Sequence, residues 1–328
     1  MSSSSSSSST VLKPVLLDRL VQSKVWGGHH LDAMFGIRSP DGEPIGETWE
    51  LFDRPEAGSS LRSGGTLREL MEFDRRGLLG RDVRPAFGGR FPLLFKFLDA
   101  QTELSVQVHP DDAAAAAHGD GGKTEAWLVL QTLEDARIVR GFQPGVTRTQ
   151  FEAVAHTAEV ESLLYKFRPE VGDCIYVPAG TVHAIGPGAV VFEVQQNSDI
   201  TWRLYDWGRN RTVHLEHGVP ASRITDGSLD STVPPKPLPD GGTLLLANPF
   251  FRMRRYALQQ KLEFETQGAF VVVTVLSGQG TIGWHSGGAD MPIRVKAGDC
   301  VLVPAATPSV FVSPIGSLDI VLTDPARS

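Results

Sequence analysis

Short apolar runs separated by glycine, proline and aspartate dominate the chain from residue 92 onwards. Typical runs are PLLFKFL (92–98), LSVQVH (104–109), EAWLVL (125–130) and AVVFEVQQ (189–196). They are rich in branched and aromatic side chains and are bounded by turn residues, which is typical of β-strands. The pattern therefore predicts many short strands that pack as a sandwich or a barrel.

Helical signals are fewer and lie between these runs. The segments TLRE (66–69) and TQFE (149–152) match the capping box, in which a threonine and a glutamate three residues later satisfy the free backbone N–H groups of a helix start. Each is expected to open a short amphipathic helix. Asp111 and Asp112 precede five alanines and indicate a further helix start, although the alanines could also form a flexible linker.

One segment of the chain is repeated. GDCIYVPAGTVHAIG (172–186) is echoed by GDCVLVPAATPSVFV (298–312), with His183 matched by Ser309. In a double-stranded β-helix of the cupin kind, Gly-Asp suits a tight turn and Val-Pro-Ala begins an edge strand, where proline is tolerated. The echo therefore predicts a mainly β protein made of two cupin (jelly-roll) barrels with a few short helices. A purely structural role of the motif as turn chemistry is the simpler interpretation of the second copy.

The most plausible linker is STVPPKPLPDGG (231–242), which is rich in proline and glycine. It divides the chain into a first barrel with short helices over 14–230 and a second barrel over 243–328. The Ser-rich start, 1–13, is polar and of low complexity, so we expect it to be disordered. It has neither the basic region nor the apolar region of a secretory signal.

Composition narrows the function. The chain has 328 residues, 41% hydrophobic and 21% charged, as expected for a soluble globular protein. A net charge of −7 argues against a nucleic-acid partner, and apolar runs such as 269–276 are too short to span a bilayer. We therefore expect a cytoplasmic protein with neither nucleic-acid nor membrane partners. Cys174 and Cys300 lie at matching places in the two copies and are expected to be buried free thiols.

Four residues of the first half have the chemistry of a metal site. Gln107 and His109 alternate along one predicted strand and so share a face. Glu125 begins the next strand, and His183 follows the first VPAG turn. Two imidazoles, a carboxylate and an amide oxygen suit Zn²⁺ or a similar divalent ion with positions left open for substrate and water. Each residue alone would also suit a hydrogen-bonded position in the core or at the surface.

With these residues, the sequence resembles the type I mannose-6-phosphate isomerases (phosphomannose isomerases) in their compact bacterial form. The resemblance covers most of residues 14–210 in the family's order. It rests on GETWELFDRP (46–55), PLLFKFLDAQTELSVQVHPDD (92–112), GKTEAWLVL (122–130), GDCIYVPAGTVHAIG (172–186) and VVFEVQQNSDITWRLYDWGR (190–209). The combination of these motifs is specific to the family, whereas no single one would be.

The resemblance implies one Zn²⁺ per chain, although other divalent ions are possible. It places the metal ligands at Gln107, His109, Glu125 and His183, the catalytic groups at Arg203 and Glu193, and the substrate-binding groups at Lys96, Lys123 and Ser105. The second barrel would be metal-free, because Ser309 and an apolar VVVTVL strand stand where ligands would be. Glu47, Trp49 and Glu50 are expected to pack or to brace the first barrel.

The implied activity is a metal-dependent aldose–ketose isomerisation of mannose 6-phosphate and fructose 6-phosphate through a cis-enediol. The base could be Glu193, a histidine or a metal-bound water. The implied partner is a small hexose 6-phosphate, and the protein would be a monomer or a weak homo-oligomer. Two alternatives stay open: a sugar-phosphate-binding bicupin without turnover, and another metal-dependent bicupin enzyme such as an oxygenase, which would prefer histidine at the position of Gln107.

Overall fold

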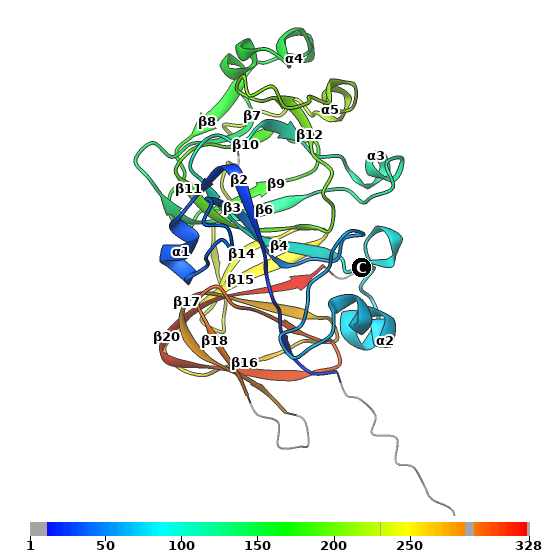
Figure 1. Cartoon of the computed structure of the whole chain (residues 1–328), viewed down its shortest axis with the longest axis vertical. Helices are drawn as coiled ribbons and strands as arrows, with labels where there is room; N and C mark the ends of the chain where they lie inside the picture. The colour runs from blue at the N-terminus through cyan, green and yellow to red at the C-terminus, as the bar shows by residue number, and fades with distance from the viewer. Residues whose placement is uncertain (1–11, 230, 286–291, 327–328) are drawn as a thin grey trace, which may run out of the picture.

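The computed structural model describes residues 12–229, 231–285 and 292–326. Figure 1 shows two β-rich halves stacked along the long axis, with the strands of the first half above those of the second. The expected disorder of 1–13 falls outside the described residues except at its last two positions. Mainly β architecture with short helices is thus confirmed.

The first half of the chain supplies two antiparallel sheets. The six-stranded sheet has the order β2-β3-β4-β11-β6-β9 and consists of Leu20–Gly28, Ile45–Leu51, Leu93–Ala100, Ala189–Gln196, Glu125–Thr132 and Cys174–Val177. The five-stranded sheet has the order β12-β5-β10-β7-β8 and consists of Trp202–Tyr205, Val106–Val108, His183–Ile185, Ile138–Phe142 and Leu164–Phe167. The two sheets face each other as in a jelly roll.

The second half is one nine-stranded sheet that folds over itself. Its main path is β1-β19-β17-β20-β15-β14-β13, made of Val15–Leu16, Cys300–Val303, Val271–Trp284, Ser309–Pro325, Phe251–Leu258, Thr243–Ala247 and Lys236–Pro237. Off this path, β16 (Leu262–Glu265) pairs with β20 and β18 (Ile293–Lys296) pairs with β17. Over the described residues, the first barrel is thus formed by two facing sheets and the second by one sheet, and the strand order of neither closes into a ring.

The two halves are joined by more than one segment. The N-terminal strand β1 pairs with β19 of the second half, with Val15 opposite Leu302. The expected linker 231–242 contributes β13, which pairs with β14. A division of the chain at this linker therefore stays a prediction. The two cysteines of the echo are buried and free, as expected, and they begin the matching strands β9 and β19.

The helices are short and lie at the sides and ends of the sheets (Figure 1). They are α1 (His30–Phe35), α2 (Leu67–Leu79), α3 (Asp112–Ala116), α4 (Arg148–Val154) and α5 (Leu215–Ala221), with 3₁₀ turns at Phe87–Gly89 and Ala158–Ser162. No helix in the described ranges is both long and apolar enough to cross a membrane.

Two of the three predicted helix starts are confirmed. The Thr66 hydroxyl accepts from the backbone N–H of Glu69, whose carboxylate accepts from the N–H of Thr66. Asp111 caps α3, so the alanines that follow are not a linker. The capping box expected at Thr149 is wrong, because α4 begins two residues earlier.

The cap of α4 is Thr147, which forms a capping box with Gln150. The overlapping segments TRTQ and TQFE both fit the pattern, and local sequence cannot choose between them. Thr147→Ala is expected to lower the free energy of unfolding by about 1 kcal/mol, because a side-chain acceptor for the first helical turn is lost. Thr149→Ala, in the exposed interior of the helix, should not destabilise the protein. Urea unfolding of both variants measures this, and equal destabilisation would contradict the assignment of the cap.

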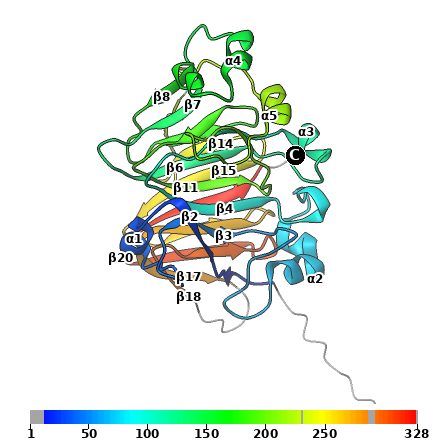
Figure 2. The ribbon, with the colours of Figure 1, turned by 45° about the horizontal axis from the view of Figure 1, so that its top comes forward.

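The central sheet of the molecule has two chemically different faces. On β11, Val190, Phe192 and Val194 belong to a large core shared with β15 and β17 of the second half. The alternate residues, such as Glu193, turn toward the five-stranded sheet. Figure 1 shows β3, β4, β6 and β11 of the six-stranded sheet below β7, β8 and β10 of the five-stranded sheet and above β16, β17 and β20 of the second half. In the turned view of Figure 2, β7 and β8 remain at the top and β17 and β18 near the bottom. The period of two in the sequence therefore divides each strand between a purely apolar interior and the interior that holds the polar candidates.

The five-stranded sheet is divided in the same way. Val106, Val108 and Ala184 face outward into a core covered by α4 and α5. The residues between them, including Gln107 and His183, face the six-stranded sheet. The register then places these two directly opposite each other on β5 and β10.

Candidate metal centre and active site

Three of the four expected metal ligands converge between the two sheets. Glu125 Oε2 lies 3.5 Å from His109 Nε2, and Glu125 Oε1 lies 3.3 Å from His183 Nε2. One ligand atom from each residue lies within 4.8 Å of the others, and all three side chains are buried. In the described part of the chain, no other group of three or more histidine, cysteine, aspartate or glutamate side chains brings its ligand atoms this close together.

Backbone carbonyls orient both imidazole rings. His109 Nδ1 lies 2.8 Å from the carbonyl oxygen of Ile200, and His183 Nδ1 lies 2.9 Å from that of Thr181. A carbonyl can only accept, so each Nδ1 carries the proton and each Nε2 presents a lone pair to the cluster. Burial lowers the pKa of His183 to about 4 and holds the pKa of His109 well below its ordinary value. Both rings are therefore neutral near pH 7, as ligands must be.

The fourth expected ligand, Gln107, also reaches the cluster. Its amide nitrogen lies 3.3 Å from His183 Nε2, and its amide oxygen accepts from the hydroxyl of Ser105 at 3.1 Å. Ser105 therefore contacts the cluster through Gln107. To offer oxygen to a cation, the amide of Gln107 would have to turn over, which exchanges two groups of nearly equal size.

Lys123 lies against the same acceptor atoms. Its ammonium donates to His109 Nε2 at 3.0 Å and to Glu125 Oε2 at 2.5 Å. A buried positive charge is thus held by two of the three candidate ligands. This contact shows that the cluster accepts a cation, and two imidazole nitrogens with a carboxylate form a donor set that suits Zn²⁺.

A second polar row crosses the six-stranded sheet. Glu193 lies opposite Lys96 on β4 and opposite Trp127 on β6. The Trp127 indole donates to Glu193 Oε2 at 2.9 Å, and Lys96 Nζ lies 3.7 Å from Oε1. Among the described residues, no donor makes a hydrogen bond to that Oε1, which is buried. Burial raises the pKa of Glu193, and the charge of Glu125 adds to this rise.

Lys96 is held between two carboxylates. Its ammonium lies 3.3 Å from Glu47 Oε2, and Glu47 Oε1 lies 2.8 Å from the ammonium of Lys24. Burial would raise the pKa of Glu47, but Lys96 and Lys24 lower it to about 2. Burial alone would lower the pKa of Lys96, yet Glu47 and Glu193 raise it above its ordinary value. The lysine is therefore charged, and Glu47 braces it as expected for a residue of the GETWEL segment.

One cavity of about 500 Å³ joins these groups. All the predicted site residues line it or its floor except His109 and His183, which contact the lining residues Lys123, Glu125 and Gln107. Arg203, on β12, lies opposite Gln107 of β5. Its guanidinium donates to the carbonyl of Thr212 at 2.6 Å. Its Nε is buried and has no acceptor among the described residues.

The cavity also contains residues that the sequence analysis missed. Lys24 comes from β2, Asp199 from the loop before β12, and Arg211 from the segment after that strand. Asp199 lies inside the S-D-x-T run that carried the resemblance, so its position was available as a signal. Nothing local marks Lys24, because it reaches the site only through the pairing of β2 with β3.

The fold and this cluster define a cupin protein with one buried His–Glu–His cation site in its first half. The family model described as phosphomannose isomerase type I, catalytic domain, matches residues 15–126. The mannose-6-phosphate isomerase of Streptococcus mutans is 34% identical over 282 residues, which are 82% of this chain and 87% of that protein. Bacillus subtilis ManA, also named mannose-6-phosphate isomerase, is 35% identical over 306 residues, which are 89% of this chain and 93% of that protein.

Solved structures agree. The mannose 6-phosphate isomerase of Bacillus subtilis superposes with a TM-score of 0.82 at 30% identity and covers 95% of this chain and 99% of its own. A zinc-bound mannose 6-phosphate isomerase superposes with a TM-score of 0.78 at 18% identity, over 96% of this chain and all of its own, which shows the shared fold. The chain belongs to the type I phosphomannose isomerase family.

Proposed function

We propose that this protein interconverts mannose 6-phosphate and fructose 6-phosphate with the help of one zinc ion. The observation that carries this proposal is the buried cluster of His109, Glu125 and His183 together with Oε1 of Glu193, which accepts no hydrogen bond from the described residues. A cation site and a buried carboxylate in one cavity can supply the charge stabilisation and the base that proton transfer between neighbouring carbons of a sugar uses. The printed names of the relatives, mannose-6-phosphate isomerases, support the same substrate.

Zinc would be held by His109, Glu125 and His183, with Gln107 as a fourth ligand through its amide oxygen. When bound, the ion supplies Lewis-acid stabilisation of the negative charge that develops on a substrate oxygen. The hydroxyl of Ser105 now donates to the amide oxygen of Gln107, and after the amide turns over it would instead accept from the amide nitrogen. The carbonyls of Ile200 and Thr181 keep both imidazoles in the tautomer that can bind a metal.

We assign the proton transfer between C2 and C1 to Glu193. In the open-chain aldose, Oε1 takes the proton from C2, the C–H electron pair forms the C1–C2 double bond, and the carbonyl electron pair moves to the C1 oxygen, which takes a proton from water and gives the cis-enediol. Glu193 then returns its proton to C1 while the C2 oxygen gives its proton to water and forms the new carbonyl, which gives the ketose. Trp127 fixes the carboxylate through Oε2, so Oε1 alone faces the reaction. The ammonium of Lys96 favours the ionised form in which Glu193 can act as base.

We assign the binding of the substrate's oxygen atoms to cationic side chains. Arg203 has an unpaired Nε–H at the cavity and is permanently charged, so it stabilises developing negative charge and cannot be the base. Lys96 and Lys123 are each already paired with a carboxylate. Arg211 lines the cavity too and is likewise paired with a carboxylate, that of Asp206, to which its Nε donates at 2.8 Å. Its side chain is 36% exposed against 5% for Lys123, so it is the better placed group for a solvated phosphate.

Catalysis is assigned to the first half, 14–230. Ser309, which stands where His183 stands in the echo, begins β20 in the second half. In the described parts of 243–328, no cluster of histidine, cysteine or carboxylate side chains meets the distance that the first half satisfies. We therefore propose that the second cupin half is metal-free and supports the outer face of the six-stranded sheet.

A coupled assay tests the proposed function. Zinc-loaded protein should convert mannose 6-phosphate to fructose 6-phosphate, a chelator should stop the reaction, and added zinc should restore it. Fructose 6-phosphate formation that is indifferent to chelator would contradict the metal dependence. No turnover by zinc-loaded protein would favour the binding protein among the alternatives, and isothermal titration with mannose 6-phosphate would then measure that binding.

A further inference from the structure

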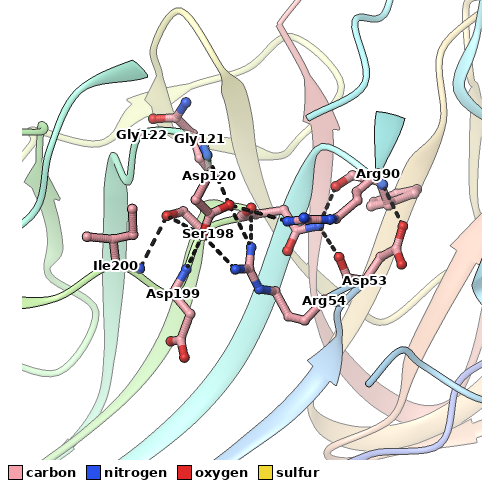
Figure 3. A network of polar contacts seen from close by, with 12 residues as sticks. Asp53, Arg54, Arg90, Asp120, Gly121, Gly122, Ser198, Asp199 and Ile200 are labelled. Atoms are coloured by element: carbon pink, nitrogen blue, oxygen red, sulfur yellow. Dashed lines mark hydrogen bonds and ion pairs between the residues drawn. The ribbon is translucent and has the colours of Figure 1, made fainter. Parts of the chain in front are cut away.

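Figure 3 shows a buried ion-pair network of Arg54, Arg90 and Asp120. These three residues are not among those that line the cavity of the active site. At its centre the carboxylate of Asp120 accepts two hydrogen bonds from Arg54, at 3.1 and 2.6 Å, and one from Arg90 at 3.3 Å. The side chains of Asp120 and Arg54 are each only 7% exposed. Such a pair is costly to desolvate and is retained only where its geometry serves a purpose or its charges are fully satisfied.

The same carboxylate also accepts hydrogen bonds from the first residues of two loops. It accepts the backbone N–H of Gly121 at 2.9 Å, the hydroxyl of Ser198 at 3.3 Å and the N–H of Asp199 at 3.4 Å. Figure 3 shows Asp120 between these loops, with the carboxylate of Asp199 turned away from the network. Arg54 adds a bond to the carbonyl of Asn197 at 2.8 Å. One buried carboxylate therefore fixes the start of both loops.

Each loop ends at the metal centre. The loop that begins at Gly121 leads within a few residues to Lys123 and Glu125, the first residue of β6. The loop that begins at Ser198 carries Ile200, whose carbonyl orients His109. The Ser198 hydroxyl, which donates to Asp120, also accepts from the N–H of Ile200 at 3.3 Å.

We propose that the Arg54–Asp120 pair positions the metal centre. The pair fixes the loop that leads to Glu125 and the loop that carries Ile200 relative to each other. This inference rests on the proposed zinc-dependent function. The hydrogen bonds and ion pairs of Asp120 with the described residues include none to the four expected metal ligands, so it acts through the loops. Its route to His109 runs through Ser198 and Ile200, and its route to Glu125 runs through Gly121. Outer-shell partners of this kind commonly control metal affinity.

Asp120→Asn tests the proposal with little change of shape. It removes the charge that both arginines and both loops share, so zinc affinity should fall about 10- to 100-fold. Zinc affinity is measured by competition with a chromophoric chelator, and the cobalt-loaded variant should show an altered visible absorption spectrum. The matched control is Asp324→Asn, because Asp324 is a buried carboxylate held by Arg252 and Arg254 in the second half. It should lose comparable stability with zinc affinity and cobalt spectrum unchanged.

Ser198→Ala is the second variant and decides the matter if Asp120→Asn does not fold. It removes one hydroxyl between Asp120 and Ile200 and leaves the ion pair in place, so zinc affinity should again fall, by less than in Asp120→Asn. Wild-type affinity in Ser198→Ala, or equal losses in Asp120→Asn and Asp324→Asn, would overturn the proposal. Wild-type protein that binds zinc without forming fructose 6-phosphate would instead overturn the proposed function, and the comparison of zinc affinities would still stand.

Discussion

Replacing His183 by alanine is expected to abolish zinc binding and isomerase activity together. Its Nε2 lies 3.3 Å from Glu125 Oε1 and 3.3 Å from the amide nitrogen of Gln107, so it is in contact with two other expected ligands. The ring is buried, and alanine leaves no donor in its place. Loss of a ligand should exceed the roughly 10- to 100-fold cost of losing an outer-shell partner. Zinc content after dialysis and the coupled assay measure the two effects.

The control for this variant lies in the second half of the chain. Ser309 occupies the place of His183 in the echoed segment and begins β20. Ser309→Ala should keep zinc content and activity at the wild-type level, because no metal cluster is assigned to that half. If Ser309→Ala lost the metal and His183→Ala kept it, the site would have been assigned to the wrong half.

Replacing Glu193 by glutamine should lower kcat by about 10²- to 10⁴-fold, the usual contribution of a positioned acid–base group. Glutamine has nearly the same size and can still accept from the Trp127 indole, so the sheet around it should be undisturbed. Glu193 makes no contact with His109 or His183 that would change the ligand set, and zinc content should stay at the wild-type level. A kcat close to that of the wild type would show that another group, such as a histidine, is the base.

The pH profile gives an independent test of the same assignment. The pKa of Glu193 is raised, first by burial and then by the charge of Glu125. A base must be ionised, so kcat of the wild type should fall as pH drops through this raised pKa, and the acid limb should lie above the ordinary glutamate value of about 4.3. The residual activity of Glu193→Gln should lack this limb. Saturating zinc is required throughout, because protonation of the histidines at low pH would also release the metal.

Much of this architecture could be predicted from local patterns in the sequence. Alternation along LSVQVH (104–109) predicted that Gln107 and His109 share a face, and the structure brings both to the cluster between the sheets. The family resemblance alone pointed to Lys96 and Glu193, which lie opposite each other on β4 and β11 at the cavity. Composition at the ends of the runs identified the short strands and the turn that precedes His183. Where two local patterns overlapped, as at Thr147 and Thr149, the sequence was ambiguous and the prediction failed.

The types of ligand could also be predicted, but their partners could not. Histidine, carboxylate and amide side chains at strand positions indicated a cation site before any fold was known. The contact of Lys123 with His109 and Glu125, and the lack of a hydrogen-bond donor for Oε1 of Glu193 among the described residues, were not visible in the pattern. These contacts depend on which sheet faces which and at what register.

The sequence by itself thus determined most of the short strands, the shared face of Gln107 and His109, and the donor chemistry of the first half. Only the tertiary structure decided that Arg54, Asp120 and Ser198, which are far apart along the chain, form one buried network behind the ligands. The physical reason is the distance along the chain over which each interaction acts. Side-chain alternation and capping act over a few residues, whereas the meeting of distant charges is settled by the packing of whole sheets, whose apolar faces fix where each polar residue comes to lie.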